Sequence, residues 1–309
     1  MLKFSVVIPT RNRPEWVRRC IDSLLRQNPI PYEIIVVDAS SQLDTENLIK
    51  NNYNFVGYYK FLNGFNQRPK SKNIGICKAR GDILAFLDDD SLVQKDWIKT
   101  CLDSYSNDNI GAVGGRVIDI NDPNPLIQIG GNREIGRLTF SGKRINNFNM
   151  QISHVIEVDH LRGGNISIRR HLLELMGGYD TYYIGTNVFE ETDLCVRIKK
   201  LGYHVVYNSD MLIEHHFAPR EKIQRNLRSF RTNFYIARNG TYFMFINFSI
   251  FRSLFFLFTD HTGIPALIKQ PSFTRLLLIF IYFIGKVTGI FACIKNIFTR
   301  HRRGAIVKC

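Results

Sequence analysis

The first 110 residues alternate short apolar runs with amphipathic segments. The apolar runs are rich in β-branched residues, which is typical of buried strands, and the segments between them carry apolar residues at helical spacing. Pro14 is well suited to a first helical turn. Strands are expected over 4–8, 33–37 and 83–87. Three helices are expected: one that begins at Pro14, one over 44–50 and one over 71–79. This order predicts a parallel sheet covered by helices on both faces.

The pattern changes from Gly111 onward, where pairs of glycines separate short segments. This punctuation predicts loops and a smaller mixed sheet. The glycine pairs are at 114–115, 130–131, 163–164 and 177–178. A helix is expected over 190–201, followed by a strand over 203–207.

Two long apolar stretches lie near the C-terminus. Thr241–Phe258 is interrupted by Arg252 and Leu276–Ile294 by Lys286, and each is close to the ~20 residues that cross a bilayer. The loop between them is poor in Lys and Arg, so a hairpin with both ends in the cytoplasm fits the positive-inside rule. The internal charges favour helices that lie in the membrane interface instead. Core helices of a soluble appendage are a third interpretation.

The charge balance favours anionic partners. The chain has 41 Lys and Arg against 27 Asp and Glu, a net charge of +14. Nucleic acid, anionic lipid headgroups and a phosphate-bearing substrate all fit such a balance. The basic runs 220–238 and 300–308 flank the apolar stretches, which is typical of a membrane surface, and no run interleaves basic residues with exposed stacking aromatics. We therefore expect an anionic membrane surface as a partner and no nucleic acid.

The cysteine spacing and the N-terminal residues bear on whether the protein binds zinc and where in the cell it works. The six cysteines contain no C-x-x-C pair, so a zinc site is not expected. Met1 to Ile8 is too short, and too soon followed by Pro9, for a signal peptide. We expect the protein on the cytoplasmic face of the membrane, either peripheral or anchored by the hairpin.

Acidic side chains follow the third expected strand. Asp88, Asp89 and Asp90 repel one another unless a cation or hydrogen-bond donors compensate, and Mg²⁺ or Mn²⁺ takes such oxygens while bridging substrate phosphates. A polar turn that caps the next helix is the alternative. Thr10 and Asp38 also fall at strand ends, where parallel sheets bind ligands. The coincidence favours a metal site.

Two later segments add weaker signals. Glu190 and Glu191 stand at the start of an expected helix, where acidic residues are common, but a general base is also possible there. His215, after an apolar run, is a candidate metal ligand or phosphate contact, although a lone histidine is more often structural.

In their order along the chain, these pieces resemble the family 2 glycosyltransferases of the GT-A fold over residues 3–240. Any one piece is unspecific, but their joint order and spacing are specific. The pieces are Val6–Arg13, Cys20–Gln27, Ile35–Ser41, Lys72–Gly75, Ala79–Asp82, Phe86–Asp90, Gly163–Asn165, Arg169–Arg170, Gly177–Asp180, Glu190–Leu194, Arg197, Gly202–Tyr203 and His215.

The resemblance implies a fold, a site and a reaction. The fold is α/β, a Rossmann-like and mostly parallel sheet with helices on both faces, plus a hydrophobic helical C-terminal region. The implied nucleotide-sugar ligands are Pro9, Thr10, Arg13, Asp38, Lys72, Asp88 and Asp89. The implied acceptor residues are Gly164, Asn165 and Glu190, the metal ligands are Asp88, Asp90 and His215, and the base is Glu191. The implied regions are 1–118 for the nucleotide sugar, 119–217 for the acceptor within the same GT-A domain, and 218–309 for the membrane.

The implied reaction is an inverting, Mn²⁺- or Mg²⁺-dependent transfer of a sugar from a nucleoside diphosphate to a hydroxyl of a glycan or lipid-linked acceptor. Ala39 replaces a second acid often found in the base-binding loop, so a UDP-sugar is favoured but dTDP- and GDP-sugars stay open. Glu191 is one methylene longer than the usual Asp. A nucleotidyltransferase, or a membrane-associated nucleotide- or carbohydrate-binding protein without turnover, are the alternative functions.

Overall fold

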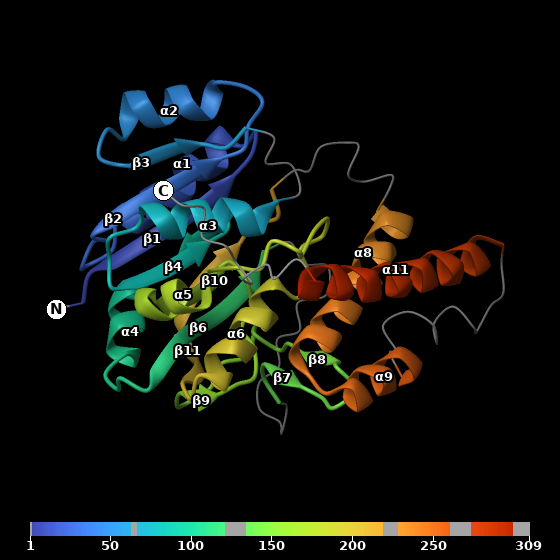
Figure 1. The fold of residues 1–309 in the computed structure, drawn as a ribbon. Helices are drawn as coiled ribbons and strands as arrows, with labels where there is room; N and C mark the ends of the chain where they lie inside the picture. The colour runs from blue at the N-terminus through green and yellow to red at the C-terminus, as the bar shows by residue number, and fades with distance from the viewer. Residues whose placement is uncertain (1, 63–66, 121–133, 219–227, 260–272, 299–309) are drawn as a thin grey trace.

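A computed structural model of the protein describes residues 2–62, 67–120, 134–218, 228–259 and 273–298. The basic run 300–308 and the first part of the other run, 220–227, lie outside these residues. Figure 1 shows a lobe built on one large sheet beside a group of three helices, α8, α9 and α11.

The large sheet has nine strands and is parallel through its N-terminal half. Its order is β3-β2-β1-β4-β10-β6-β11-β5, and β9 pairs with β11. The strands are β1 (Phe4–Thr10), β2 (Glu33–Asp38), β3 (Gly57–Lys60), β4 (Ile83–Leu87), β5 (Ser91–Val93), β6 (Ile110–Asp119), β9 (Ile156–Glu157), β10 (Asn165–Arg169) and β11 (His204–His215). The expected parallel sheet is confirmed, and the three strands expected in the first half are β1, β2 and β4.

The glycine-rich second half does not build a smaller sheet of its own. Its long strands join the main sheet, where β10 lies antiparallel between β4 and β6, and β11 runs parallel to β6. Only β7 (Arg137–Leu138) and β8 (Arg144–Ile145) form a separate ribbon among the described residues. The expectation of a smaller mixed sheet was wrong because Gly114 and Gly115 lie inside β6, where neighbouring side chains and backbone leave no room for a Cβ.

Helices cover both faces of the sheet. One apolar core joins α1, α2 and α4 to one face, and a second core joins α3, α5 and α6 to the other. These latter three helices lie in front of the sheet in Figure 1. The helices are α1 (Pro14–Leu25), α2 (Asp44–Asn52), α3 (Arg68–Lys78), α4 (Trp97–Ser104), α5 (Arg170–Met176) and α6 (Glu190–Lys200).

The C-terminal helices are α8 (Arg228–Asn247), α9 (Ile250–Thr259) and α11 (Phe273–Phe298). The apolar stretch Thr241–Phe258 is therefore two helices, broken after Asn247. Within α8, Tyr242 and Phe243 are fully buried in a third core that also contains Tyr183. A hairpin of two spanning helices is therefore wrong for the first stretch, because its side chains pack against the lobe built on the sheet.

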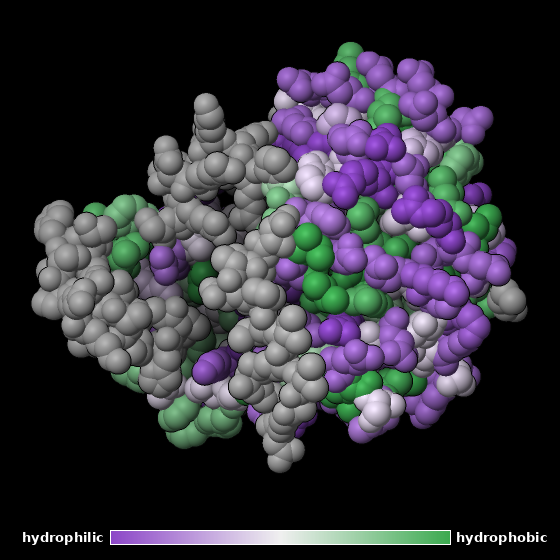
Figure 2. Space-filling model, turned by 180° about the vertical axis from the view of Figure 1, so that it is seen from behind, coloured by the Kyte–Doolittle hydropathy of each residue, from purple (hydrophilic) through white to green (hydrophobic). Residues whose placement is uncertain are grey.

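The second stretch contains one long apolar helix. Leu277–Phe298, within α11, is long and apolar enough to cross a bilayer, and only 28% of its most apolar window is buried. Figure 2 shows hydrophobic side chains on the outside of the C-terminal helices, whereas most of the lobe built on the sheet is hydrophilic. The charges inside these helices bond to backbone oxygens: Lys286 donates to Leu257 O at 2.8 Å and Arg252 to Phe140 O at 2.9 Å.

Candidate active site

The acidic triplet lies directly after β4, at the edge of the sheet where β1 and β2 also end. Asp89 turns toward β1, because its carboxylate accepts hydrogen bonds from Thr10 Oγ1 at 2.7 Å and from Arg13 Nη1 at 2.9 Å. Burial raises the pKa of Asp89 to about 6, against the opposing charge of Arg13. Asp89 is thus held by Thr10 and Arg13, and Arg13 also bonds to Asp90 Oδ2 at 3.3 Å.

Asp88 and Asp90 meet His215, which ends β11. One ligand atom from each of the three lies within 4.8 Å of the others. His215 Nε2 is 3.3 Å from Asp90 Oδ1, and Ala218 N donates to the other oxygen of Asp90 at 3.0 Å. Burial acts to raise the pKa of Asp90, but these contacts hold it below the usual range. Two carboxylates and one imidazole form a donor set that suits a divalent cation.

A second layer fixes the imidazole of His215. Its Nδ1 is 2.9 Å from Asp119 Oδ1, and Arg162 binds both oxygens of Asp119 at 2.6 and 2.9 Å. Burial acts to lower the pKa of His215, but hydrogen bonds with Asp119 and Asp90 raise it to about 9. An imidazole oriented by a carboxylate behind it is the arrangement common to histidines that bind metals. Asp119 and Arg162 were not predicted from the sequence, since neither belongs to a local pattern.

Glu191 and Asp88 both lie against a pair of consecutive glycines, Gly163 and Gly164. A Cβ at Gly163 would lie 2.1 Å from Glu191 Oε1, and a Cβ at Gly164 would lie 2.6 Å from Asp88 Oδ2. Consecutive Cα atoms are ~3.8 Å apart. The two carboxylates therefore pack against consecutive residues of the loop before β10, where a side chain at either position would displace one of them.

Lys72 holds both glutamates at the start of α6. Its Nζ donates to Glu190 Oε1 at 2.9 Å and to Glu191 Oε1 at 2.7 Å, and only 1% of its side chain is exposed. Burial raises the pKa of Glu190 to about 8. The pKa of Glu191, which burial acts to raise, is lowered to about 2 chiefly by the charge of Lys72. Glu191 is thus the ionised member of the pair.

Several residues that were expected to bind ligands make hydrogen bonds within the protein. Lys72 is enclosed by its two glutamates, which does not support the expected contact with the diphosphate. Glu190 is fully buried, and Asn165 is fully buried with hydrogen bonds to Trp97 Nε1, Arg116 O and Met211 O. A role of either side chain in binding the acceptor stays a prediction.

Asp38, at the end of β2, also makes its hydrogen bonds within the protein. Asp38 is fully buried and accepts hydrogen bonds from Tyr58 OH at 2.7 Å and from Ser40 N at 2.8 Å. Pro9, next to Thr10 at the end of β1, is partly buried. The expected nucleotide ligands Pro9, Thr10, Arg13 and Asp38 therefore share one sheet edge with Asp88, and their direct contacts remain predictions.

Two cations near the site, Arg68 and Arg144, were not predicted from the sequence. Arg68, at the start of α3, feels the carboxylate of Asp88 most strongly and those of Glu190 and Glu191 next, which raises its pKa. Arg144 of β8 lies 4.1 Å from the ring of Phe189, beside α6. The sequence around Arg68 shows no helical periodicity of apolar residues, so its position near the site follows only from the fold.

Comparison with known proteins identifies the chain. The family described as glycosyl transferase family 2 matches residues 5–174, more than half of the protein. The chain belongs to this family. It is a glycosyltransferase that takes a nucleotide sugar as donor and a glycan as acceptor.

Individual relatives agree with this assignment. The chain is 26% identical over 229 residues to the O-antigen chain rhamnosyltransferase RfbN of Salmonella typhimurium, covering 72% of this chain and 70% of the relative. It is 27% identical over 235 residues to the glucosyl-dolichyl phosphate glucuronosyltransferase of Haloferax volcanii, covering 69% of each. Its fold is similar to that of the mannosyltransferase PcManGT of Pyrobaculum calidifontis, with a TM-score of 0.57, 15% identity, and 97% and 88% of the two chains covered. The predicted GT-A architecture and enzyme class are confirmed.

Proposed function

We propose that this glycosyltransferase inverts the configuration at the anomeric carbon in a divalent-cation-dependent reaction, with Glu191 as the base. The observation that supports the proposal is the glycine pair 163–164, against which the Glu191 carboxylate and the Asp88 carboxylate pack at consecutive residues. A base on one side of the reacting carbon and an anion-binding centre on the other is what an in-line displacement requires.

Asp88, Asp90 and His215 fit a divalent cation, because their donor atoms converge and His215 is oriented from behind by Asp119. When bound, Mn²⁺ or Mg²⁺ would offset negative charge on the departing diphosphate. The structure of PcManGT to which the fold is similar is a complex with GDP-Man and Mn²⁺. Arg68 adds a positive charge on the same side of the site.

Glu191 takes the proton of the acceptor hydroxyl, and the hydroxyl oxygen attacks the anomeric carbon as the diphosphate leaves from the opposite face. Lys72 keeps Glu191 ionised and ready to accept the proton. Because Glu191 acts as a base and no covalent intermediate is invoked, an α-linked donor gives a β-linked product.

The acceptor is proposed to be lipid-linked and the enzyme to work at the cytoplasmic surface of a membrane. The exposed apolar side chains of α9 support this placement, since Phe251 and Phe258 are 70% and 86% exposed. The Haloferax relative carries a dolichyl phosphate substrate in its name. Flotation of the full chain with anionic vesicles should decrease when Phe251 and Phe258 are both replaced by serine, and an unchanged fraction would exclude this surface.

A screen of nucleoside diphosphates by thermal shift, with and without Mn²⁺, tests the donor and the metal together, because a ligand that binds only the folded state raises its stability. We expect Mn²⁺ to increase the shift given by one nucleotide, and Asp90→Ala to remove that increase. The anomeric configuration of the product, determined by NMR with the matching sugar nucleotide, tests inversion. A retained configuration would sink the mechanism.

A further inference from the structure

Phe189, two residues before the proposed base Glu191, has a left-handed backbone with φ +79° and ψ −4°. Six of the described residues other than glycine have a positive φ, and four of these are Asn or Asp, which tolerate it. The remaining two are Phe189 and Phe217, which follows the proposed metal ligand His215 by two positions. A left-handed backbone at a bulky residue persists only where surrounding contacts impose it, and such residues are concentrated at functional sites.

Contacts from two other segments hold the ring of Phe189, which is buried. It stacks on the ring of Phe243 in α8, with 5.0 Å between the ring centres and 24° between the planes. The guanidinium of Arg144 in β8 lies 4.1 Å from the centre of the same ring. A Cβ at Gly240 of α8 would lie 3.2 Å from Cε2 of Phe189, so the helix approaches the ring at a residue without a side chain. These contacts determine where the ring lies.

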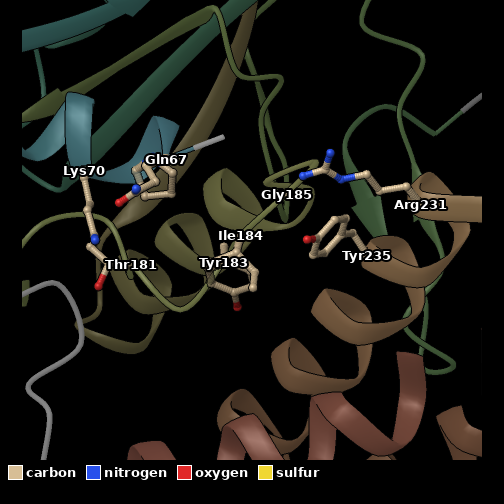
Figure 3. A pocket seen from close by; sticks show the side chains of 9 residues that line it. Gln67, Lys70, Thr181, Tyr183, Ile184, Gly185, Arg231 and Tyr235 are labelled. Atoms are coloured by element: carbon tan, nitrogen blue, oxygen red, sulfur yellow. The ribbon is translucent and has the colours of Figure 1, made fainter. Parts of the chain in front are cut away.

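The loop that leads to α6 is held by the same face of α8. Tyr235, Asn239 and Phe243 are four residues apart along this helix, so their side chains share one face. A Cβ at Gly185 would lie 2.3 Å from Tyr235. Asn239 Nδ2 donates to Ile184 O at 3.0 Å. Figure 3 shows Ile184 and Gly185 beside Tyr235, at the edge of a cavity of about 370 Å³. The loop is thus fixed against α8 before it reaches the helix that carries the base.

The backbone of Phe189 sets the direction in which α6 begins. Its carbonyl accepts a hydrogen bond from Asp193 N at 2.8 Å, which closes the first turn of the helix, and Glu191 lies within this turn. Lys72 Nζ donates to the carboxylate of Glu191 at 2.7 Å. The carboxylate also packs against Gly163, where a Cβ would lie 2.1 Å from Oε1. A change in the backbone at Phe189 therefore moves the carboxylate relative to both of these contacts.

We propose that Phe189 is a positioning residue: its buried ring imposes the left-handed turn that aims the carboxylate of Glu191 at the acceptor hydroxyl. This role rests on the proposed function, since it requires Glu191 to be the base. Phe189 touches no reacting atom and acts only through Glu191. The contacts with Arg144 and Phe243 keep the ring, and so the turn, in place.

Two variants that both lack the ring separate the turn from the packing. Glycine adopts the left-handed backbone freely, whereas alanine has a Cβ that disfavours it. The assay is nucleotide release by the full-length protein, with the sugar nucleotide identified by thermal shift. We expect the kcat of Phe189→Ala to be about tenfold below that of Phe189→Gly, the factor that corresponds to this backbone preference, with the same donor KM in both. If the ring only fills the core, the two variants will have equal kcat, which overturns the proposal.

Asp96 provides the matched control, because it precedes α4 with φ +60° and this helix packs on the other face of the sheet. Asp96→Ala and Asp96→Gly differ in the same backbone preference, and both should keep wild-type kcat. A tenfold difference between them would mean that the effect is not specific to the base, and would overturn the proposal. Phe189→Ala should cause no further loss when it is added to Glu191→Gln. A further loss would mean that Phe189 acts by another route, which also overturns it.

Thermal unfolding of each variant shows whether it is folded. If Phe189→Ala does not fold, Phe189→Leu takes its place, since it keeps most of the buried apolar volume but has a Cβ and no ring to stack. Its kcat should be several-fold below that of the wild type, and wild-type kcat would overturn the proposal. Failure of the proposed function has a different result, because Glu191→Gln would then keep wild-type kcat. If only the positioning role fails, Glu191→Gln is impaired and the alanine and glycine variants of Phe189 are equal.

Discussion

Gly163→Ala places a methyl group against the carboxylate of Glu191. The new Cβ would lie 2.1 Å from Oε1, whereas real contacts of this kind are at least 3.0 Å, so the carboxylate must retreat by about 1 Å. The atom that moves is the end of a flexible side chain, and Gly163 has no positive φ. We therefore expect the free energy of unfolding to change by less than about 1 kcal/mol.

Activity should respond far more strongly than stability. A displacement of ~1 Å at a catalytic group can lower the rate ~10²-fold. The assay is nucleotide release from the sugar nucleotide found in the thermal-shift screen, with the KM for the donor measured alongside. We expect kcat to fall about 10²-fold with little change in donor KM, because Glu191 lies on the acceptor side.

Gly57→Ala is the control, since it adds the same methyl group to a glycine, at the start of β3, where the nearest neighbour would be 3.3 Å away. It should keep wild-type kcat. If Gly163→Ala is folded and also keeps wild-type kcat, Glu191 is not the base and the proposed geometry is refuted.

Further substitutions test the base, the acid response and the docking of α8. Glu191→Gln should lower kcat by about 10² to 10⁴-fold in the nucleotide-release assay, whereas Glu190→Gln should retain much more activity because burial already keeps Glu190 protonated. Burial lowers the pKa of His160 to about 4, helped by the charge of Arg144. As pH falls, His160 is therefore protonated in the unfolded chain before it is protonated in the folded protein. The stability that neutral His160 contributes is fully present above about pH 6.5 and is lost as pH falls from there to about 4. The loss is about 3 kcal/mol, and His160→Leu should flatten this slope in denaturant titrations. Tyr242→Phe should lower the unfolding free energy by about 1–3 kcal/mol, because the hydroxyl donates to buried Asp180 at 2.6 Å.

Each of these has a contrary outcome. Equal losses of kcat in the two glutamine variants would mean that the pair acts as a unit and not through Glu191 alone. A wild-type acid slope in His160→Leu would assign acid unfolding to other groups. Tyr32→Phe, at an exposed position, is the control for Tyr242→Phe, and equal effects of the two would remove the argument for a docking contact.

The strand ends were predictable because apolar runs and the residues that follow them are local signals. β1, β2 and β4 are such runs, and parallel pairing brings their carboxyl ends to one edge. Asp88 and Asp90 could therefore be placed from the sequence, and His215 followed from the order of motifs. The orientation of Asp89 could not, because it depends on Arg13, a residue 76 positions away.

Contacts between residues that are far apart in the chain could not be predicted from the sequence for the same reason. Lys72 was expected at the diphosphate, but the fold brings it to Glu190 and Glu191, 118 and 119 positions away. The stretch Thr241–Phe258 was ambiguous in principle, since helices that pack in a core and helices that meet a membrane share the same apolar composition. Only the contact of Tyr242 and Phe243 with the catalytic lobe distinguishes the two.

The C-terminal helices and the proposed base are parts of one mechanical unit. Asp193 lies two residues after Glu191 on α6, and its buried carboxylate accepts a hydrogen bond from Asn247 Nδ2, at the end of α8, at 2.7 Å and from Arg197 Nε at 2.8 Å. A chain cut before α8 would leave Asp193 without the amide of Asn247 and would uncover Tyr183. The helix that carries the base is thus held by the same segment that packs against the apolar helix α11. The packing of α8 against α11 and the position of Glu191 are therefore coupled through a buried hydrogen bond, and we expect a displacement of α8 to shift α6.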